Sequence, residues 1–257
     1  MKKIQKYLDT QLKNIKYLLR KPANEYTNDT IHQLRVRIKK LNSLLVLLKY
    51  DFKDFKAKKC IKPLKQVFRK AGDIRELQIE EDKLEFYFLN NSLPKYRSIL
   101  NKNRAEFQNA FSSILESSDP AVLKKIRHYL GPFLKNVNRQ RIKKYIDKSI
   151  CEINKTINQI PFQNKIIHDI RKKLKNLMYI QESVAVKGND ELIMQINSLS
   201  ELLGDWHDYK VTIRHLENID PKNLTPSENR EIEKIKQDFN SKSTTLLSKM
   251  NLNRLPL

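Results

Sequence analysis

Glycine and cysteine are both scarce in this chain. Only four of the 257 residues are glycine and only two are cysteine. Because glycine supplies most of the positive-φ positions in tight turns, so few glycines argue against a hairpin-rich β protein. Cys60 and Cys151 form no Cys-x-x-Cys pair, and each lies in a helical apolar pattern. We therefore expect both to be buried thiols in a reducing compartment.

Long apolar runs are also missing. No stretch approaches the roughly 18 consecutive apolar residues that a membrane-spanning helix needs. The first residues are basic, with Lys2 and Lys3, but the apolar segment of a secretory signal does not follow them. We expect a cytoplasmic protein that has no membrane partner.

Acidic residues are too few to balance the basic ones. The chain has 51 Lys and Arg against 29 Asp and Glu, which gives a formal net charge of +22. Self-repulsion on this scale destabilises a compact protein and favours a polyanionic partner. A lysine-rich, solvated surface would give the same total, but it would not place the basic residues at repeated positions.

Apolar residues recur every three or four positions along nearly the whole chain, which predicts an all-α fold. We expect helix breaks at Gly72–Asp73 and near Gly204, and either a kink or a helix start at Pro63. Turns are expected at Pro161 and Gly188–Asn189. The expected helices are residues 3–21, 30–50, 52–71, about 73–89, 93–116, 118–132, 137–160, about 162–186, 190–217 and 227–250.

Two short patterns occur twice, in the same order. Residues 31–41 and 167–177 each place a histidine, then an arginine three residues later and a lysine seven residues later, among apolar residues. Residues 71–77 and 203–209 share a Gly-Asp pair and follow the first pattern at nearly the same separation in both halves. We therefore interpret the chain as a duplicated unit.

The histidine pattern predicts a cationic stripe opposite the apolar face of a helix. A solvated face usually mixes acids with bases, but no Asp or Glu occurs from residue 30 to 50. Arginine and lysine suit phosphate oxygens, and histidine gains a proton beside phosphate, so we expect tighter anion binding near pH 6 than pH 8. The stripes comprise His32, Arg35, Lys39 and Lys40 in the first half and His168, Arg171, Lys172 and Lys175 in the second.

The Gly-Asp segments suggest a second layer of the same site. The aspartates of the two pairs, Asp73 and Asp205, are interpreted as helix N-caps after a break. Glu76 and Asp208 would hold basic neighbours in place. A capped helix kink without any binding role is the alternative. The residues at the matching place in the two copies that would reach a ligand are Arg75 and His207.

Taken together, the doubled patterns resemble the CHAD family, the conserved histidine α-helical domain, over roughly residues 3–250. Its signature is a His-x-x-Arg-x-x-x-(Lys/Arg) helix in each half, followed by Gly-x-x-(Arg/His)-(Asp/Glu). The resemblance implies two four-helix-type bundles related by a pseudo-twofold axis, with a basic central groove that binds inorganic polyphosphate. The expected polyphosphate-binding residues are His32, Arg35, Lys39, Lys40, Arg75, His168, Arg171, Lys172, Lys175 and His207.

The resemblance also sets expectations for boundaries and chemistry. Asn42 and Met178 stand where family motif helices often carry a further arginine. The Glu-x-Glu-x-Lys strand of an accompanying triphosphatase domain is absent from the sequence, so we expect no enzymatic activity, no catalytic residue, no metal and no cofactor. The expected parts are a first bundle over 1–117, a connecting segment over 118–136, a second bundle over 137–250 and a tail over 251–257.

Three alternatives remain open from the sequence. The net charge also suits a helical nucleic-acid-binding protein, although no zinc finger or helix-turn-helix is recognisable. The adjacent pairs His168-Asp169 and His207-Asp208 suggest a metal-dependent phosphohydrolase of the HD type, although its full ligand pattern is not met. A purely structural scaffold is the third alternative.

Overall fold

The computed structural model describes residues 2–22, 25–157, 163–184, 190–250 and Leu255. These residues are almost entirely helical and contain no β-strand, so the predicted all-α fold class is confirmed. The helices are α1 (Lys2–Leu19), α2 (Asn28–Asp51), α3 (Ala57–Ile61), α4 (Lys65–Leu89), α5 (Pro94–Glu116), α6 (Val122–Lys135), α7 (Arg139–Ile157), α8 (Asn164–Val184), α9 (Asp190–Glu217) and α10 (Pro226–Met250).

Several helix ends follow local sequence signals. Pro94 opens α5, as its fixed φ and missing N–H favour at the first helical position. Before α10, Thr225 and Glu228 form a capping box, in which each side chain accepts a hydrogen bond from the other residue's backbone N–H, at 3.1 and 2.9 Å. The buried Glu228 carboxylate also accepts a hydrogen bond from the Lys95 N–H at 2.7 Å. This one acid therefore joins the starts of α5 and α10.

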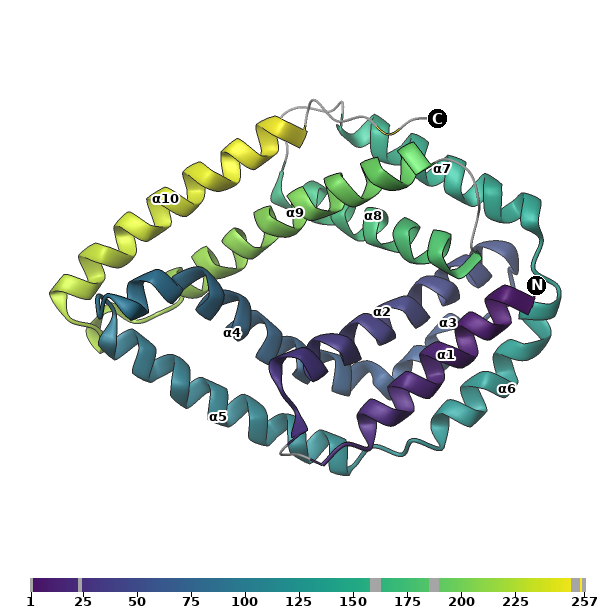
Figure 1. Ribbon diagram of the computed structural model, residues 1–257, viewed down its shortest axis with the longest axis horizontal. Coiled ribbons are helices and arrows are strands. Elements are labelled where there is room, and N and C mark those ends of the chain that lie inside the picture. Colours follow the sequence, from purple (N-terminus) through teal and green to yellow (C-terminus); the bar gives the residue numbers. More distant parts are fainter. Residues whose placement is uncertain (1, 23–24, 158–162, 185–189, 251–254, 256–257) are drawn as a thin grey trace.

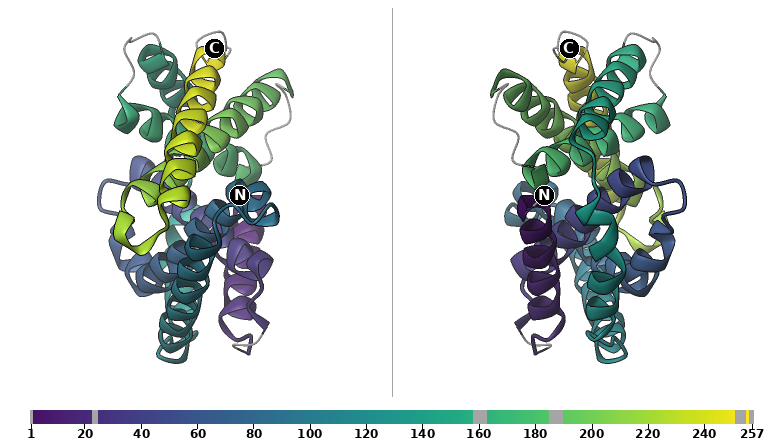
Figure 2. Two further views of the ribbon diagram at one scale, coloured as in Figure 1. Left: turned by 90° about the vertical axis from the view of Figure 1, so that its left-hand side faces the viewer. Right: turned by 90° about the vertical axis from the view of Figure 1, so that its right-hand side faces the viewer.

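The helices form two groups in space. In Figure 1, α1 to α6 lie mostly in the lower part of the molecule and α7 to α10 in the upper part, and the side views of Figure 2 keep that division. Within the groups, α1 packs on α2, α4 on α5, α7 on α8 and α9 on α10. The peripheral helices thereby cover the outer sides of α2, α4, α8 and α9.

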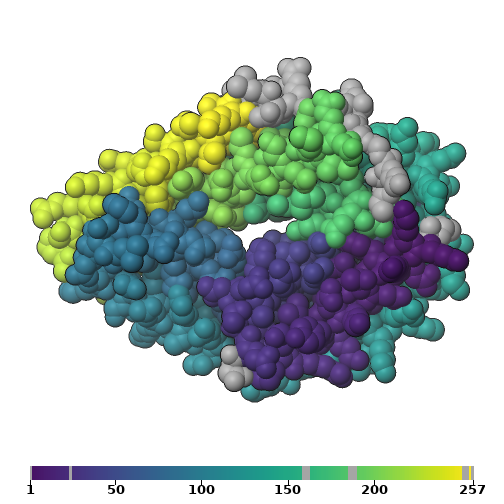
Figure 3. Space-filling view, viewed as in Figure 1, coloured from purple at the N-terminus to yellow at the C-terminus, as the bar shows by residue number. Residues whose placement is uncertain are grey.

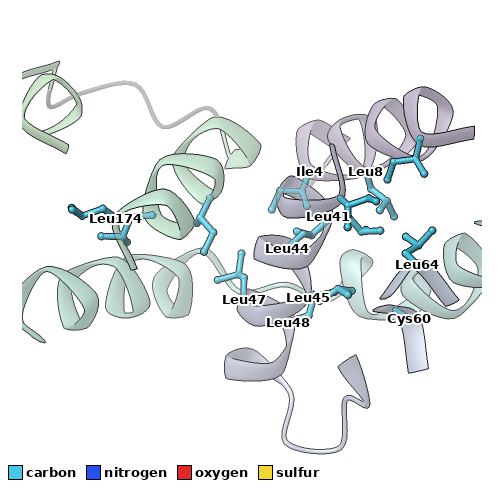
Figure 4. Close-up of a cluster of buried hydrophobic side chains, with 14 of the residues drawn as sticks. Ile4, Leu8, Leu41, Leu44, Leu45, Leu47, Leu48, Cys60, Leu64 and Leu174 are labelled. Atoms are coloured by element: carbon cyan, nitrogen blue, oxygen red, sulfur yellow. The ribbon is translucent and has the colours of Figure 1, made fainter. Parts of the chain in front are cut away.

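Two hydrophobic clusters hold this arrangement together. The larger one takes side chains from α1, α2, α4, α6, α7, α8 and α9, and Figure 4 shows its part around Leu41 and Leu45 of α2. The smaller cluster joins α4, α5, α9 and α10. The predicted apolar faces of the motif helices are buried, as Leu34 and Leu174 illustrate. The larger cluster includes residues from both predicted halves, so one core spans them.

The predicted breaks at Gly72 and Gly204 are wrong. The helix α4 continues through Gly72, and α9 continues through Gly204. A single glycine inside a helix costs only about 1 kcal/mol relative to alanine, and the buried apolar faces on both sides outweigh that cost. Asp73 and Asp205 are therefore interior helix residues and not N-caps.

A single kinked helix over 52–71 is wrong, and the alternative prediction, a helix start near Pro63, agrees with the structure. The short helix α3 ends at Ile61, a 3₁₀ turn covers Lys62–Leu64, and α4 begins at Lys65. Pro63 lies in the 3₁₀ turn because it has no backbone N–H to donate to a preceding helical turn.

The predicted connecting segment contains a longer helix than expected. The helix α6 passes through Gly131 and Pro132, where an end was predicted, and stops at Lys135. Its buried leucines, among them Leu130 and Leu134, keep it packed in the larger cluster beside α1. Much of the segment 118–136 therefore belongs to the core, while the domain boundaries themselves stay a prediction.

A few further predictions concern single residues. Cys60 is buried as expected, but Cys151 is partly exposed, and both thiols are free. The turns at Pro161 and Gly188–Asn189 lie outside the described residues, as does the tail apart from Leu255, which is buried and donates its N–H to Asn154 at 3.0 Å. In the part of the chain that the structure describes, no helix is both long and apolar enough to span a membrane.

Candidate anion-binding site

Four helices form a closed ring at the centre of the molecule. The helix α2 packs on α4 and α8, and α9 packs on the same two helices. Figure 1 shows these four helices bordering a central gap, and the space-filling view in Figure 3 shows an opening there that side chains leave unfilled. Both motif helices, α2 and α8, and both helices that carry the Gly-Asp pairs, α4 and α9, thus meet at one place.

The ring gathers cations that are far apart in the sequence. Burial, together with the charges of Arg35, Arg171, Lys175 and Arg75, lowers the pKa of the Lys39 ammonium to about 7. These charges come from α2, α8 and α4, so the two predicted stripes do converge. Whether they bind polyphosphate stays a prediction.

Arg35 is held in place by α4. Its Nη1 donates a hydrogen bond to the backbone carbonyl of Phe68 at 2.7 Å, and its guanidinium lies 4.5 Å from the centre of the Phe68 ring. A Cβ atom at Gly72 would lie only 2.6 Å from that Nη1 atom. Gly72 is therefore required for the close approach of Arg35 to α4, and not for a helix break.

Arg171 occupies the same motif position in α8 but is not held. Its Nε atom is buried and has no hydrogen-bond partner, and its side chain forms no ion pair within the described ranges. A Cβ atom at Gly204, the counterpart of Gly72, would meet nothing within 4 Å. Buried donors are almost always paired, so this one marks a place where a ligand or water is expected.

Three histidines of the predicted site lie near its cations. The rings of His168 in α8 and His207 in α9 have their centres 5.2 Å apart. Burial, together with the charge of Arg171, lowers the pKa of His207 to about 3. Burial and nearby cations also lower the pKa values of His168 and of His32, although His32 is exposed. In the absence of an anion these imidazoles are therefore neutral at pH 7.

The acid of the first Gly-Asp segment does hold basic neighbours, as predicted. Glu76 lies 2.6 Å from Nη2 of Arg214 and 3.4 Å from Nε2 of His215, both in α9. Its hydrogen bond with His215 lowers the pKa of Glu76. Its negative charge is thus matched by α9.

A second buried acid reinforces this contact between α4 and α9. His215 also contacts Glu80 at 2.6 Å, and Glu80 in turn accepts a hydrogen bond from the hydroxyl of Tyr96. Burial opposes the charge on His215, but hydrogen bonds to Glu76 and Glu80 outweigh it and raise the pKa of His215 to about 9. His215 therefore carries a positive charge at neutral pH, which was not predicted because it lies outside both repeated patterns.

Asp208 differs from Glu76 although it occupies the matching position. Burial raises the pKa of Asp208, and the charge of Arg171 acts in the opposite direction. Its carboxylate has no hydrogen-bond donor in the part of the chain that the structure describes. The predicted role of Asp208 in holding a basic neighbour thus finds no contact to support it.

Two of the predicted residues are already paired with acids. Lys40 lies 2.6 Å from Glu182 of α8, and Lys172 lies 3.0 Å from Asp169. No sequence pattern indicates the first pair, since its members are 142 residues apart. Of the remaining predicted residues, Arg75 donates a 3.3 Å hydrogen bond to Gln78 and is one of the charges acting on Lys39.

The site holds many nitrogen donors and few metal ligands. The described ranges include no group of three or more His, Cys, Asp and Glu residues that could hold a metal ion. Asp169 is exposed and paired with Lys172. The HD-type alternative therefore has no metal site in the described ranges to support it.

The fold and the site together define an all-helical protein with a ring of helices around converging cations. Comparison with known proteins gives its family. A family model for the CHAD domain matches residues 4–217, so the chain belongs to the CHAD family. The crystal structure of the CHAD domain from the plant Ricinus communis has the same fold, with a TM-score of 0.77 at 14% sequence identity. The alignment covers 100% of this chain and 93% of that one. No curated protein matches the sequence.

Proposed function

We propose that this chain binds inorganic polyphosphate in the opening of its central helical ring and catalyses no reaction. The CHAD family is associated with polyphosphate binding, and the site's chemistry agrees with that association. Since Lys40 and Lys172 already have acidic partners, we assign the binding to the other eight predicted residues. These are His32, Arg35, Lys39, Arg75, His168, Arg171, Lys175 and His207.

The observation that carries the proposal is the unpartnered guanidinium of Arg171. Its buried Nε donor has no acceptor among the described residues, and its charge acts on Lys39, Arg35 and His207. A phosphate oxygen at this place would accept that hydrogen bond and offset the repulsion among the cations. Arginine suits this task because its planar fork matches phosphate oxygens.

The crowding of cations also supports a polyanion over a single small anion. Burial and then the positive charges of its neighbours lower the affinity of Lys39 for a proton, which raises the free energy of the unliganded protein. A chain of phosphates supplies several negative charges at once and relieves several repulsions together. Its binding should weaken steeply as salt rises, because bound counterions are released on association.

The pairing of helices supports an internal duplication, which we include in the proposal. In the first half α1 packs on α2, α2 on α4 and α4 on α5, and in the second half α7 packs on α8, α8 on α9 and α9 on α10. The contacts α2–α8 and α4–α9 then join like helices from the two halves. Such a pattern is what a pseudo-twofold axis through the central opening would produce.

The test is binding of labelled long-chain polyphosphate to the purified protein at about 0.15 M salt. Pyrophosphate, heparin and duplex DNA serve as competitors. The double variant Arg35→Glu/Arg171→Glu reverses two charges in the ring. Its matched control, Lys124→Glu/Arg230→Glu, reverses two exposed charges on the peripheral helices α6 and α10.

The proposal predicts binding that survives in the control and is lost in the ring variant, with circular dichroism showing that both variants remain helical. Displacement by DNA at equal phosphate concentration would instead favour the nucleic-acid alternative. Equal binding by both double variants would mean that the ring cations are not the site.

A further inference from the structure

At one end of the cationic stripe on α2, the last lysine forms an ion pair with an acid. Lys40 follows Lys39 directly, and its side chain is only 14% exposed. Its Nζ atom lies 2.6 Å from Oε1 of Glu182 in α8 and 5.7 Å from the centre of the Tyr179 ring. The positive charge of Lys40 is therefore matched within the protein.

Glu182 is placed to act on a ligand as well as on Lys40. Its side chain is 45% exposed, so a negatively charged chain that continued along α2 beyond Lys39 would approach its carboxylate. Glu182 also raises the pKa values of Tyr7 and Tyr179, although burial is the larger cause for both tyrosines. The charge of Glu182 therefore reaches beyond Lys40, although Arg37 opposes it at Tyr7.

The other motif helix has no such acid. The residue eight positions after its histidine, where α2 has Lys40, is Asn176, which donates a 2.6 Å hydrogen bond to the hydroxyl of Tyr145. The residue of α2 that matches Glu182 is Val46, which is exposed. The ion pair thus occurs at one end of the pseudo-twofold site and not at the other.

From this asymmetry we propose that Glu182 is a specificity-determining residue, which ends the phosphate-binding site at Lys40. If the proposed function holds, on which this inference rests, the polyphosphate chain leaves the ring on the side away from Glu182. The acid neutralises Lys40 and repels a phosphate that would otherwise bind there. Removing its charge should extend the site by one cation.

The test compares two substitutions of the same kind. Glu182→Gln releases Lys40. Glu152→Gln releases Lys173, which lies 2.6 Å from Glu152 across the contact between α7 and α8, and Lys148, which lies 4.0 Å from it. The two acids are matched in exposure, at 45% and 43%, and both variants raise the net charge by one. The control thereby separates a local effect at the site from a general gain in positive charge.

We expect Glu182→Gln to tighten binding of long-chain polyphosphate about five-fold and to steepen its salt dependence. Glu152→Gln should change the affinity less than two-fold. Lys40→Gln should weaken binding modestly in the wild-type protein, because it leaves the charge of Glu182 uncompensated. In the Glu182→Gln background it should only remove the gain, so that the double variant binds about as tightly as the wild-type protein.

Equal effects of Glu182→Gln and Glu152→Gln would overturn the inference while leaving the proposed function intact. So would a Lys40→Gln/Glu182→Gln double variant that binds much more weakly than the wild-type protein, because Lys40 would then already bind phosphate in the wild-type protein. Failure of the wild-type protein to bind polyphosphate at all would refute the proposed function, and this inference with it.

Discussion

The two arginines of the repeated motif occupy matching places and have different surroundings. Arg35 is locked on α4 by the carbonyl and ring of Phe68 and by the absence of a side chain at Gly72. A Cβ atom at Gly204 would meet nothing within 4 Å, and among the described residues the buried Nε of Arg171 has no partner. The same sequence pattern thus yields one arginine that the fold has already satisfied and one that is available to a ligand.

The motif lysines differ as well. Lys39 is surrounded by cations from three helices, whereas Lys175 also has Glu201 and Asp208 near it, whose charges raise its pKa and partly oppose the effect of burial. Positive charge is therefore least compensated around Lys39, where the two halves meet, whereas the charge of Asp208 acts on Arg171 without a hydrogen bond between them in the described ranges. We infer that the halves contribute unequally, with Arg171 making the main contact and Arg35 shaping the site around it.

The largest expected effect separates the two arginines. Arg171→Gln should weaken polyphosphate binding about 10- to 100-fold, because a charge-assisted hydrogen bond contributes about 1.5–3 kcal/mol. Arg35→Gln should weaken binding less and destabilise the protein more, because it leaves the Phe68 carbonyl without its donor. Titration with labelled polyphosphate and urea unfolding of both variants measure the two effects. Equal losses of affinity would show that the difference in their surroundings has no functional consequence.

Lys39→Met should weaken binding but stabilise the unliganded protein, and both effects should be smaller than those of the arginine substitutions. The variant should bind polyphosphate about ten-fold more weakly, and the unliganded protein should become more stable. Because the folded-state pKa of Lys39 is about 7, below its ordinary value of 10.5, its destabilising effect is complete below pH 7 and fades toward pH 10.5. Thermal unfolding at pH 6 and pH 9.5 should therefore show the larger gain at pH 6. A variant that is less stable at both pH values would contradict the crowding of cations.

The two glycines should respond to alanine in opposite directions. Gly204→Ala should raise the free energy of unfolding by about 1 kcal/mol, since the helix gains a better former and the new methyl meets open space. Gly72→Ala should lower it by about 1 kcal/mol, because displacing Arg35 from Phe68 outweighs the same gain. Urea unfolding of the two single variants tests this directly. If both stabilised the protein equally, Arg35 would not be locked by α4.

The smallest expected effect is a dependence of binding on pH. Phosphate should raise the lowered pKa of Lys39, so the affinity should fall about three-fold from pH 6 to pH 8 as the free protein loses that proton. His32 and His168 add to the same trend if phosphate raises their lowered pKa values into this range. Lys39→Met should reduce this fall in affinity between pH 6 and pH 8, and Lys175→Met should reduce it less. An affinity that is constant across this range would remove proton uptake from the mechanism.

The sequence predicted the elements of this site better than their contacts. Periodicity gave the buried faces of α2 and α8, and Leu93-Pro94 marked the start of α5, because these signals are local. The sequence alone predicts a helix break at Gly72, whereas the glycine makes room for the side chain of Arg35, which lies 37 positions earlier in the chain and in another helix. The Lys40–Glu182 pair could not be predicted for the same reason: it depends on how α2 and α8 cross.

The most direct test of the central claim is a crystal structure of the protein with long-chain polyphosphate. We predict phosphates in the central opening, with oxygens about 3 Å from Nε of Arg171 and from Nζ of Lys39. Phosphates bound only to exposed outer lysines, such as Lys58 and Lys59 of α3, with the opening empty, would contradict the account.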